Sequence, residues 1–298
     1  MKRLLLTGAS GFLGRNIKPI LEKVYLVDTI GRTPDNMIVA DLSAEKPKLS
    51  EKYDMVLHAA GKAHVTPRSG KEKQQFYDVN YQGTINLCEA LSESGLPGTF
   101  IFISTIAVYG LMEGNQVDEQ QPLKGASAYA KSKIMAETYL QEWCSKHHVN
   151  LVILRPPLLI GKDAPGNFGS MLRGIRKGYY LSIGGGNARK SYLMAEDIGK
   201  IALLAEGKQG IFNICDDYHP TMRELENAIS NKLGKRRPIS IPCWMAKVMA
   251  IIGDIVGNKV PFNTSKLEKL TYSLTISNEK AKKAFGWEPL HVLNNLKL

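Results

Sequence analysis

Short apolar runs alternate with helical patterns through the first half of this chain. Short apolar runs bounded by polar or turn residues are typical of buried strands, and apolar residues spaced three and four apart are typical of helices. Strands that alternate with helices predict a parallel, doubly wound α/β sheet, the Rossmann arrangement. The predicted strands cover residues 2–6, 24–27, 37–40, 55–57, 99–103 and 151–154, and the predicted helices cover 15–22, 75–93 and a segment that contains Tyr129.

The pattern becomes more mixed after residue 160, which is where we place a domain boundary. Helices are expected near 167–177, 195–206, 221–233, 243–256 and 277–285. We therefore predict a Rossmann domain at 1–160. The remainder, 161–298, is mostly a smaller α+β domain that binds substrate and could return a strand to the sheet.

A glycine motif marks the first turn of the predicted sheet. Gly8, Gly11 and Gly14 follow a strand and open a helix, which is the arrangement that lets backbone N–H groups approach a pyrophosphate. Asp28 lies 20 residues after Gly8, at the predicted end of the second strand, where a carboxylate accepts bonds from an adenosine ribose. This favours NAD over NADP, although nearby Arg32 leaves NADP open.

Tyr129 and Lys133 lie four residues apart in an alanine-rich segment, so they share one face of a helix. An ammonium beside a phenol favours the phenolate and lowers the pKa of the Tyr. A Tyr with a lowered pKa can transfer protons near neutral pH. The same spacing also occurs by chance on ordinary surface helices, so the other motifs decide between the two interpretations.

Composition narrows the class of protein further. The four cysteines are widely scattered, which fits a reducing cytoplasm and predicts no metal site. We expect no signal peptide and no membrane-spanning helix.

The formal net charge is +11, and residues 171–298 hold 20 Lys and Arg against 11 Asp and Glu. Because the basic residues are dispersed and no aromatic-rich basic module appears, we expect no nucleic acid partner. The excess of basic residues in the C-terminal part therefore has three explanations: binding of an anionic substrate, contact with an anionic membrane surface, or a solvated surface without a ligand.

The segment 239–256 is markedly apolar but contains Lys247 and Asp254, so it is not expected to span a membrane. We predict a core helix of the small domain. The alternatives are contact with a membrane or with a dimer partner, and the basic residues 235–237 lie just before the segment.

Several motifs together resemble the extended short-chain dehydrogenases/reductases, in the NAD-dependent epimerase/dehydratase group that acts on nucleotide sugars. The similarity covers nearly the whole chain. The motifs are Thr7-Gly-Ala-Ser-Gly-Phe-Leu-Gly14, Ala40-Asp41-Leu42, His58-Ala-Ala-Gly61, Val79-Asn80-x-x-Gly83-Thr84, Ser104-Thr105-x-x-Val108-Tyr109-Gly110, Tyr129-x-x-x-Lys133, Leu154-Arg155-Pro156 and Lys280-Ala281-x-x-x-Phe285-Gly286-Trp287-x-Pro289.

The resemblance implies roles for individual residues. Tyr129 would take the proton from a sugar hydroxyl while hydride leaves the same carbon for nicotinamide. Thr105 would hydrogen-bond the reacting oxygen, although the adjacent Ser104 leaves the choice within that pair open. Asp41 and Leu42 would border the adenine. The other implied cofactor residues are Phe12, Leu13, Ala59, Ala60, Gly61, Asn80, Ser104, Lys133 and Pro156, and the implied substrate residues are Thr105, Asn167, Phe168, Arg189 and Lys190.

Two departures from the family pattern narrow the reaction. Ile106 and Ala107 stand where 4,6-dehydratases carry an Asp-Glu pair, so water elimination is not expected. Leu158 stands where many hexose 4-epimerases have an Asn that binds the substrate diphosphate. The Arg155-Pro-Pro version resembles a bacterial branch that serves surface-polysaccharide sugars.

The sequence therefore predicts an NAD-dependent enzyme. It would most simply be a C4 epimerase of a UDP-hexose or UDP-N-acetylhexosamine. The alternative is an NAD(P)H-dependent reductase of a 4-keto-(6-deoxy)sugar nucleotide. A non-catalytic NAD sensor or scaffold is a third interpretation, which an intact Thr105, Tyr129 and Lys133 set argues against. We also expect a homodimer through the helices near 75–93 and 128–147, a cytoplasmic location and at most peripheral contact with a membrane.

Overall fold

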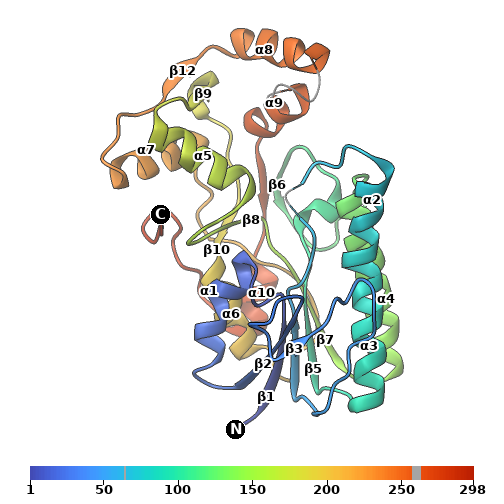
Figure 1. The fold of residues 1–298 in the computed structure, drawn as a ribbon. Helices are drawn as coiled ribbons and strands as arrows, with labels where there is room; N and C mark the ends of the chain where they lie inside the picture. Colours follow the sequence, from blue (N-terminus) through green and yellow to red (C-terminus); the bar gives the residue numbers. More distant parts are fainter. Residues whose placement is uncertain (64, 257–262) are drawn as a thin grey trace.

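The computed structural model describes residues 1–63, 65–256 and 263–298. A seven-stranded sheet, all of whose pairings are parallel, forms the large domain, with strands in the order β11-β7-β5-β4-β1-β2-β3 (Figure 1). This confirms the predicted fold class. The strands are β1 (Arg3–Thr7), β2 (Leu26–Gly31), β3 (Ile38–Val39), β4 (Met55–His58), β5 (Thr99–Ile103), β7 (Asn150–Arg155) and β11 (Gly210–Asn213).

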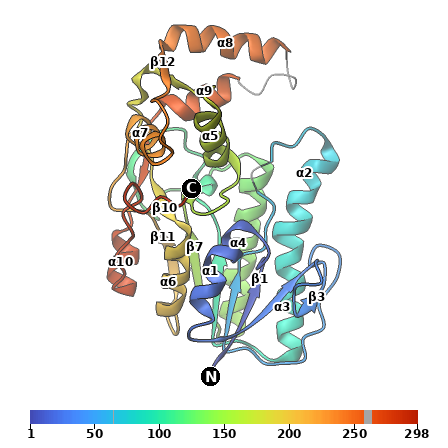
Figure 2. The ribbon, with the colours of Figure 1, turned by 60° about the vertical axis from the view of Figure 1, so that its left-hand side comes forward.

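Helices cover both faces of this sheet, as its nearly continuous apolar strands require. One face carries α1 (Phe12–Leu21), α6 (Ala195–Leu204) and α10 (Glu279–Phe285), and the other carries α2 (Gly70–Tyr77), α3 (Gly83–Ser94) and α4 (Ala128–Lys146) (Figure 2). A π-helical turn η1 (Asp78–Gln82) joins α2 to α3. Each layer has its own buried core, one containing Leu4, Leu6 and Ile198, the other Leu5, Phe100 and Leu140.

Residues beyond 160 contribute to both lobes of the molecule. The segment that contains α6 and β11 returns to the large sheet, where β11 pairs with β7. The small lobe holds α5 (Gly166–Lys177), β9 (Leu181–Ile183), α7 (Met222–Lys232), β12 (Ile239–Ile241), α8 (Cys243–Val256) and α9 (Thr264–Thr271) (Figure 1). Its core packs around Phe168, Tyr192 and Leu225.

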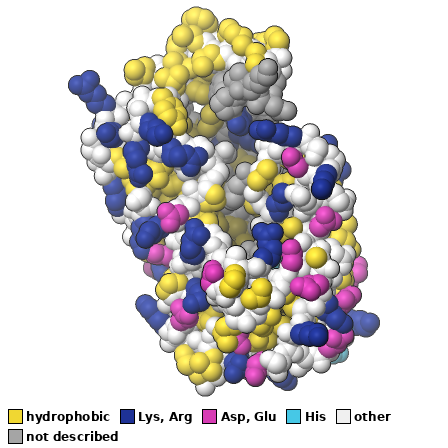
Figure 3. Space-filling view, viewed as in Figure 1, with side chains coloured by type: hydrophobic (Ala, Val, Ile, Leu, Met, Phe, Trp, Pro, Cys, Tyr) yellow, Lys and Arg dark blue, Asp and Glu magenta, His cyan; other side chains and the backbone are white. Residues whose placement is uncertain are grey.

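Short paired strands run between the lobes. β8 (Leu158–Ile160) pairs with β10 (Tyr192–Met194), and β6 (Gly114–Val117) pairs with β13 (Leu274–Ile276). Two 3₁₀ turns, η2 (Ile106–Tyr109) and η3 (Gly184–Gly186), complete the described elements. The surface is hollowed between the lobes (Figure 3).

The prediction that residues 239–256 form a core helix was wrong. α8 forms where expected, but only Ala246, Ala250 and Gly253 are buried, whereas Trp244 and Ile255 are 67% and 80% exposed. The apolar run predicted a helix correctly. It carried no information on whether another element covers that helix.

Candidate active site

The strand order reverses between β1 and β4, and their carboxyl ends therefore frame the crevice where ligands bind in open α/β sheets. A buried network ties these two ends together. The Thr7 hydroxyl lies 2.6 Å from His58 Nδ1 and accepts a bond from the Ala60 N–H at 3.0 Å. His58 Nε2 lies 3.0 Å from the Thr84 hydroxyl. Burial, aided by the Lys133 charge, lowers the pKa of His58 to about 3, so this histidine is neutral and structural.

The glycine turn has the form that a pyrophosphate requires. Gly8 has φ +73°, and a Cβ there would lie 2.7 Å from the Ala60 nitrogen. A Cβ on Gly14 would lie 2.3 Å from the Gly8 oxygen. Gly11 is the N-cap of α1, where no side chain caps the helix and no acidic residue occupies the first turn. The N–H groups of Phe12 and Leu13 at this helix start can therefore face an anion. The chain thus fits a dinucleotide cofactor at this turn.

Replacing Gly8 with Ala should weaken dinucleotide binding at least about ten-fold, because a left-handed φ costs an L-residue about 1–2 kcal/mol and the new methyl group meets backbone. Calorimetric titration with NADH and NADPH measures the loss, with circular dichroism as a check on folding. Gly70→Ala is the matched control, since a Cβ at Gly70 meets nothing within 4 Å. Unchanged affinity in a folded Gly8→Ala protein would remove this turn from the cofactor site.

Asp28 is not at the end of its strand, and this prediction was wrong. Val24 lies in the turn after α1, β2 begins at Leu26, and the strand continues to Gly31. The Asp28 carboxylate is 9% exposed, pairs with Arg3 Nη1 at 3.0 Å and accepts a bond from the Tyr53 hydroxyl. These contacts satisfy it within the protein. The residue that follows β2 is Arg32, which is exposed.

The other residues predicted to border the cofactor lie along the same edge of the sheet. Asp41 accepts bonds from Ser43, and the carbonyl of Leu42 accepts one from Asn86. Buried Asn80, in η1, accepts from the Lys62 N–H at 2.7 Å and donates to the Ser132 hydroxyl at 2.9 Å. Asn80 therefore fastens the loop after Gly61 to the helix that carries Tyr129 and Lys133. The described segments also bring Ala59 and Pro156 to strand ends, the first after β4 and the second after β7.

Tyr129 and Lys133 lie in the first two turns of α4, as the spacing predicted. Ser127 caps this helix by accepting a bond from the Ala130 N–H. The Tyr129 ring packs against Phe76 of α2, with centroids 6.2 Å apart. Thr105, the residue after Ser104 at the end of β5, forms a side-chain hydrogen bond with Tyr129. The structure therefore joins Thr105, rather than Ser104, to the Tyr.

The electrostatics of this pair differ from the expectation. Lys133 Nζ donates to the carbonyl of Ile103 at 2.8 Å and lies 4.5 Å from the centroid of the Phe102 ring. Burial lowers the pKa of Lys133 to about 8. Burial also raises the pKa of Tyr129, a change that the hydrogen bond with Thr105 opposes. The direction of the Tyr129 shift is therefore opposite to the lowered pKa that the sequence predicted.

A buried polar network behind the pair was missed from the sequence. Glu137 continues the face of Tyr129 and Lys133 by one more step of four residues. Its carboxylate accepts from Arg155 Nε at 3.1 Å and Nη2 at 2.5 Å, and also from the Ser104 hydroxyl. Arg155 Nη1 donates to the Tyr109 hydroxyl at 3.2 Å. The spacing of four residues between Tyr129, Lys133 and Glu137 could have indicated Glu137 from the sequence. The contact between Glu137 and Arg155 depends on the fold and has no such signal in the sequence.

The residues predicted to contact substrate have different surroundings. Asn167 is exposed in the first turn of α5, but Phe168 is 1% exposed and packs in the small-lobe core, so its ring is not presented to a ligand. The Arg189 side chain is half exposed, and its Nη1 donates to the carbonyl of His219 at 2.8 Å. Burial and the neighbouring Lys269 charge lower the pKa of Lys190 to about 8. An anion bound near Lys190 and Lys269 would reduce the repulsion between these two cations.

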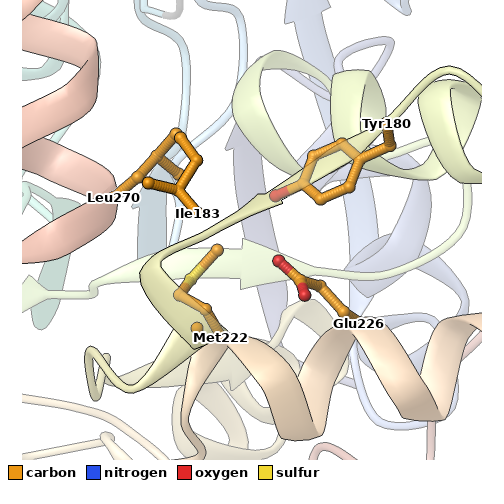
Figure 4. A pocket seen from close by; sticks show the side chains of 6 residues that line it. Tyr180, Ile183, Met222, Glu226 and Leu270 are labelled. Carbon is orange, nitrogen blue, oxygen red and sulfur yellow. The ribbon is translucent and has the colours of Figure 1, made fainter. Parts of the chain in front are cut away.

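A small cavity lies within the small lobe, between β9, α7 and α9 (Figure 4). Ile183, Met222 and Leu270 form its apolar lining, and the Tyr180 hydroxyl points toward the carboxylate of Glu226. Glu226 hydrogen-bonds with Tyr180 and Ser182. Tyr129, Lys133 and Thr105 are absent from its lining, so this cavity is separate from the predicted active site.

A glycine turn at the switch point of a Rossmann sheet, with a Tyr and a Lys on one helix beside it, is the arrangement of the short-chain dehydrogenase/reductase class, whose members use NAD(P). The chain belongs to the NAD dependent epimerase/dehydratase family, whose model matches residues 4–215. Among the described residues, no cluster of His, Cys, Asp and Glu could hold a metal ion.

Individual relatives are distant. The chain is 29% identical to the N-acetyl-α-D-glucosaminyl-diphospho-ditrans,octacis-undecaprenol 4-epimerase of Escherichia coli O157:H7, over 89% of this chain and 84% of that protein. It is 26% identical to the GDP-6-deoxy-D-mannose reductase of Pseudomonas aeruginosa, over 75% and 78%. Among solved structures, RMD from Pseudomonas aeruginosa complexed with NADPH gives a TM-score of 0.75 at 22% identity, over 98% of this chain and 95% of that one.

Proposed function

We propose that this protein catalyses hydride and proton transfer at C4 of a nucleotide-activated sugar. The observation that carries the proposal is the set formed by Thr105, Tyr129 and Lys133, which the carboxyl edge of the sheet brings together beside the glycine turn. A scaffold protein would not need a phenol hydrogen-bonded to a threonine at this edge. The similarity to the UDP-glucose 4-epimerase of Vibrio cholerae and to the GDP-6-deoxy-D-mannose reductase of Pseudomonas aeruginosa supports the choice of substrate class.

Each residue of the set has a distinct task. Tyr129 exchanges the proton of the C4 oxygen, and Thr105 holds that oxygen by hydrogen bonding. Lys133, whose ammonium is fixed by the Ile103 carbonyl, would hold the nicotinamide ribose and would bias the phenol toward ionisation when ligands are bound. Bound NAD(P) would supply or accept the hydride. Ile106 and Ala107 follow Thr105 in η2 and cannot transfer protons, so elimination of water is not part of the reaction.

One observation favours the reductive direction, in which a 4-keto sugar becomes an alcohol. Thr7 of β1 pairs with Ile30 of β2, so Arg32 follows β2 close to the glycine turn, where the adenosine ribose would lie. An exposed guanidinium there suits a 2′-phosphate. We therefore favour an NADPH-consuming 4-ketoreductase, and the NAD preference inferred from Asp28 loses its basis.

Replacing Arg32 with Ala should weaken binding of NADPH by about 10–100-fold and leave binding of NADH nearly unchanged, because a charge-assisted hydrogen bond contributes about 1.5–3 kcal/mol. Calorimetric titration of both cofactors gives the ratio. Lys23→Ala, an exposed cation in the turn before β2, is the control for loss of a positive charge. An unaltered NADPH-to-NADH ratio in the Arg32 variant would return the cofactor assignment to NAD.

An epimerase that retains NAD is the second candidate. It is favoured by the match to the E. coli 4-epimerase, which extends over most of both chains.

The reductase and the epimerase differ in whether they consume NADPH. Purified protein is incubated with UDP-, GDP- and dTDP-hexoses, their 4-keto-6-deoxy derivatives and undecaprenyl-diphosphate-linked N-acetylglucosamine, with and without NADPH. Mass spectrometry and absorbance at 340 nm follow the products. Stoichiometric oxidation of NADPH with a keto sugar supports the reductase, whereas isomerisation without added reductant supports the epimerase.

A further inference from the structure

Helix α8 presents an uncovered apolar surface at the outer end of the small lobe (Figures 1 and 2). Hydrophobic side chains gather over this end of the molecule (Figure 3). Surface hydrophobic residues scattered singly are ordinary, but a continuous patch of this kind marks an interaction site. The exposed side chains on α8 are Trp244, Met245, Val248, Met249, Ile251, Ile252, Ile255 and Val256.

The helix packs on the protein through small residues and turns its large residues outward. Ala246, Ala250 and Gly253 are buried, and the two alanines form a small core with Leu267 of α9. Trp244, Val248, Ile251 and Ile255 follow one another at steps of four, three and four residues, which places them together on the opposite face. The outward face is therefore a single apolar strip.

Exposed basic residues precede the strip in the chain and also lie on α8. Lys235, Arg236 and Arg237 are exposed in the segment that leads to β12 and α8, and Lys247 is exposed on α8 itself. In the part of the chain that the structure describes, no ion pair involves these four cations. The acidic residue of α8, Asp254, accepts a hydrogen bond from the Thr264 hydroxyl. Among the described residues, the cations beside the apolar strip therefore lack an ion-pair partner, and the single carboxylate of α8 is bound by α9.

We propose that the outward face of α8 docks this protein onto an anionic lipid bilayer, with the helix lying in the plane of the membrane surface. An apolar strip with a Trp, bordered by lysines and arginines, matches the boundary between acyl chains and anionic headgroups. None of the helices that the structure describes is long and apolar enough to cross a membrane. The proposal concerns the small lobe alone and does not depend on the reaction catalysed.

Co-sedimentation of the purified protein with vesicles tests this docking. Vesicles of phosphatidylglycerol and phosphatidylcholine should bind at least about ten times more protein than vesicles of phosphatidylcholine alone. Ile251→Asp/Ile255→Asp should abolish binding, and Arg236→Glu/Arg237→Glu should weaken it. Val24→Asp, an exposed apolar residue in the turn after α1, is the matched control and should bind as the wild type does.

Trp244 gives a second readout that does not depend on sedimentation. It is 67% exposed, whereas Trp143 and Trp287 are 7% and 3% exposed, so a blue shift of the emission on adding anionic vesicles reports α8. Absence of both the shift and sedimentation would overturn the proposal. So would a dimer in analytical ultracentrifugation that the Ile251→Asp/Ile255→Asp substitution dissociates, because the strip would then be covered by a second copy.

Discussion

Tyr129→Phe is expected to reduce turnover by a factor of about 10² to 10⁴, the contribution that a positioned proton donor makes. The substitution removes a hydroxyl whose described partner is Thr105 and leaves the ring against Phe76. Neither the packing of α4 nor the cofactor edge of the sheet changes. The loss should therefore appear in kcat, while the affinity for NADPH or NAD stays within about two-fold of the wild type.

Tyr139→Phe is the matched control for this experiment. Tyr139 lies on the same helix, and its ring meets Tyr81 with centroids 6.4 Å apart. Among the described residues, the groups that affect its pKa are Cys88, Glu89, Tyr81 and Cys144, none of which belongs to the Thr105, Tyr129 and Lys133 set. Its activity should equal that of the wild type, measured by NADPH oxidation and by mass spectrometry of the sugar product. Equal turnover in Tyr129→Phe and Tyr139→Phe, with each sugar that the wild type converts, would contradict the assignment of Tyr129.

The parts of the site that the sequence predicted well are those built by contiguous residues. The glycine turn lies within one β1–α1 unit, and Tyr129 and Lys133 lie within two turns of one helix. In both, short-range sterics and helical periodicity determine the geometry. Such features do not depend on which distant segment packs against them.

The predictions that failed concern distant neighbours. The apolar run at 24–27 ended at Asp28, and we placed the end of the strand there. In the fold, Arg3 pairs with that carboxylate and the Tyr53 hydroxyl donates a hydrogen bond to it. Asp28 can therefore lie within the strand, which continues to Gly31. Ser104 and Thr105 could not be separated for the same reason, because the choice depends on Glu137, 33 residues further on.

The apolarity of α8 and Phe168 shows a related limit. Hydrophobicity predicts that a side chain favours burial, but it does not say what buries it. Phe168 is buried by the small-lobe core, whereas the large residues of α8 are exposed in the part of the chain that the structure describes. The same physical tendency therefore buries the ring of one residue that was predicted to bind substrate and leaves an apolar surface exposed elsewhere.

Arg155→Met is expected to lower the free energy of unfolding by about 3–5 kcal/mol, because it leaves the Glu137 carboxylate buried without its cation. Both side chains are nearly inaccessible, at 3% and 0% exposed, and the Arg155 guanidinium also binds the Tyr109 hydroxyl. Tyr109 in turn donates to Asn213 of β11 at 2.7 Å. The substitution therefore disturbs α4, η2 and two strands at once, which a urea titration followed by circular dichroism would measure.

Two further variants distinguish loss of this ion pair from general damage. Lys18→Met breaks an exposed ion pair with Glu22 and should cost no more than about 1 kcal/mol. The double variant Arg155→Met/Glu137→Leu removes both buried charges and should recover much of the stability lost in Arg155→Met, because an apolar pair carries no desolvation penalty. If the double variant is less stable than Arg155→Met, the carboxylate was not the source of the loss. The network would then stabilise the end of the sheet through its hydrogen bonds to Ser104 and Tyr109.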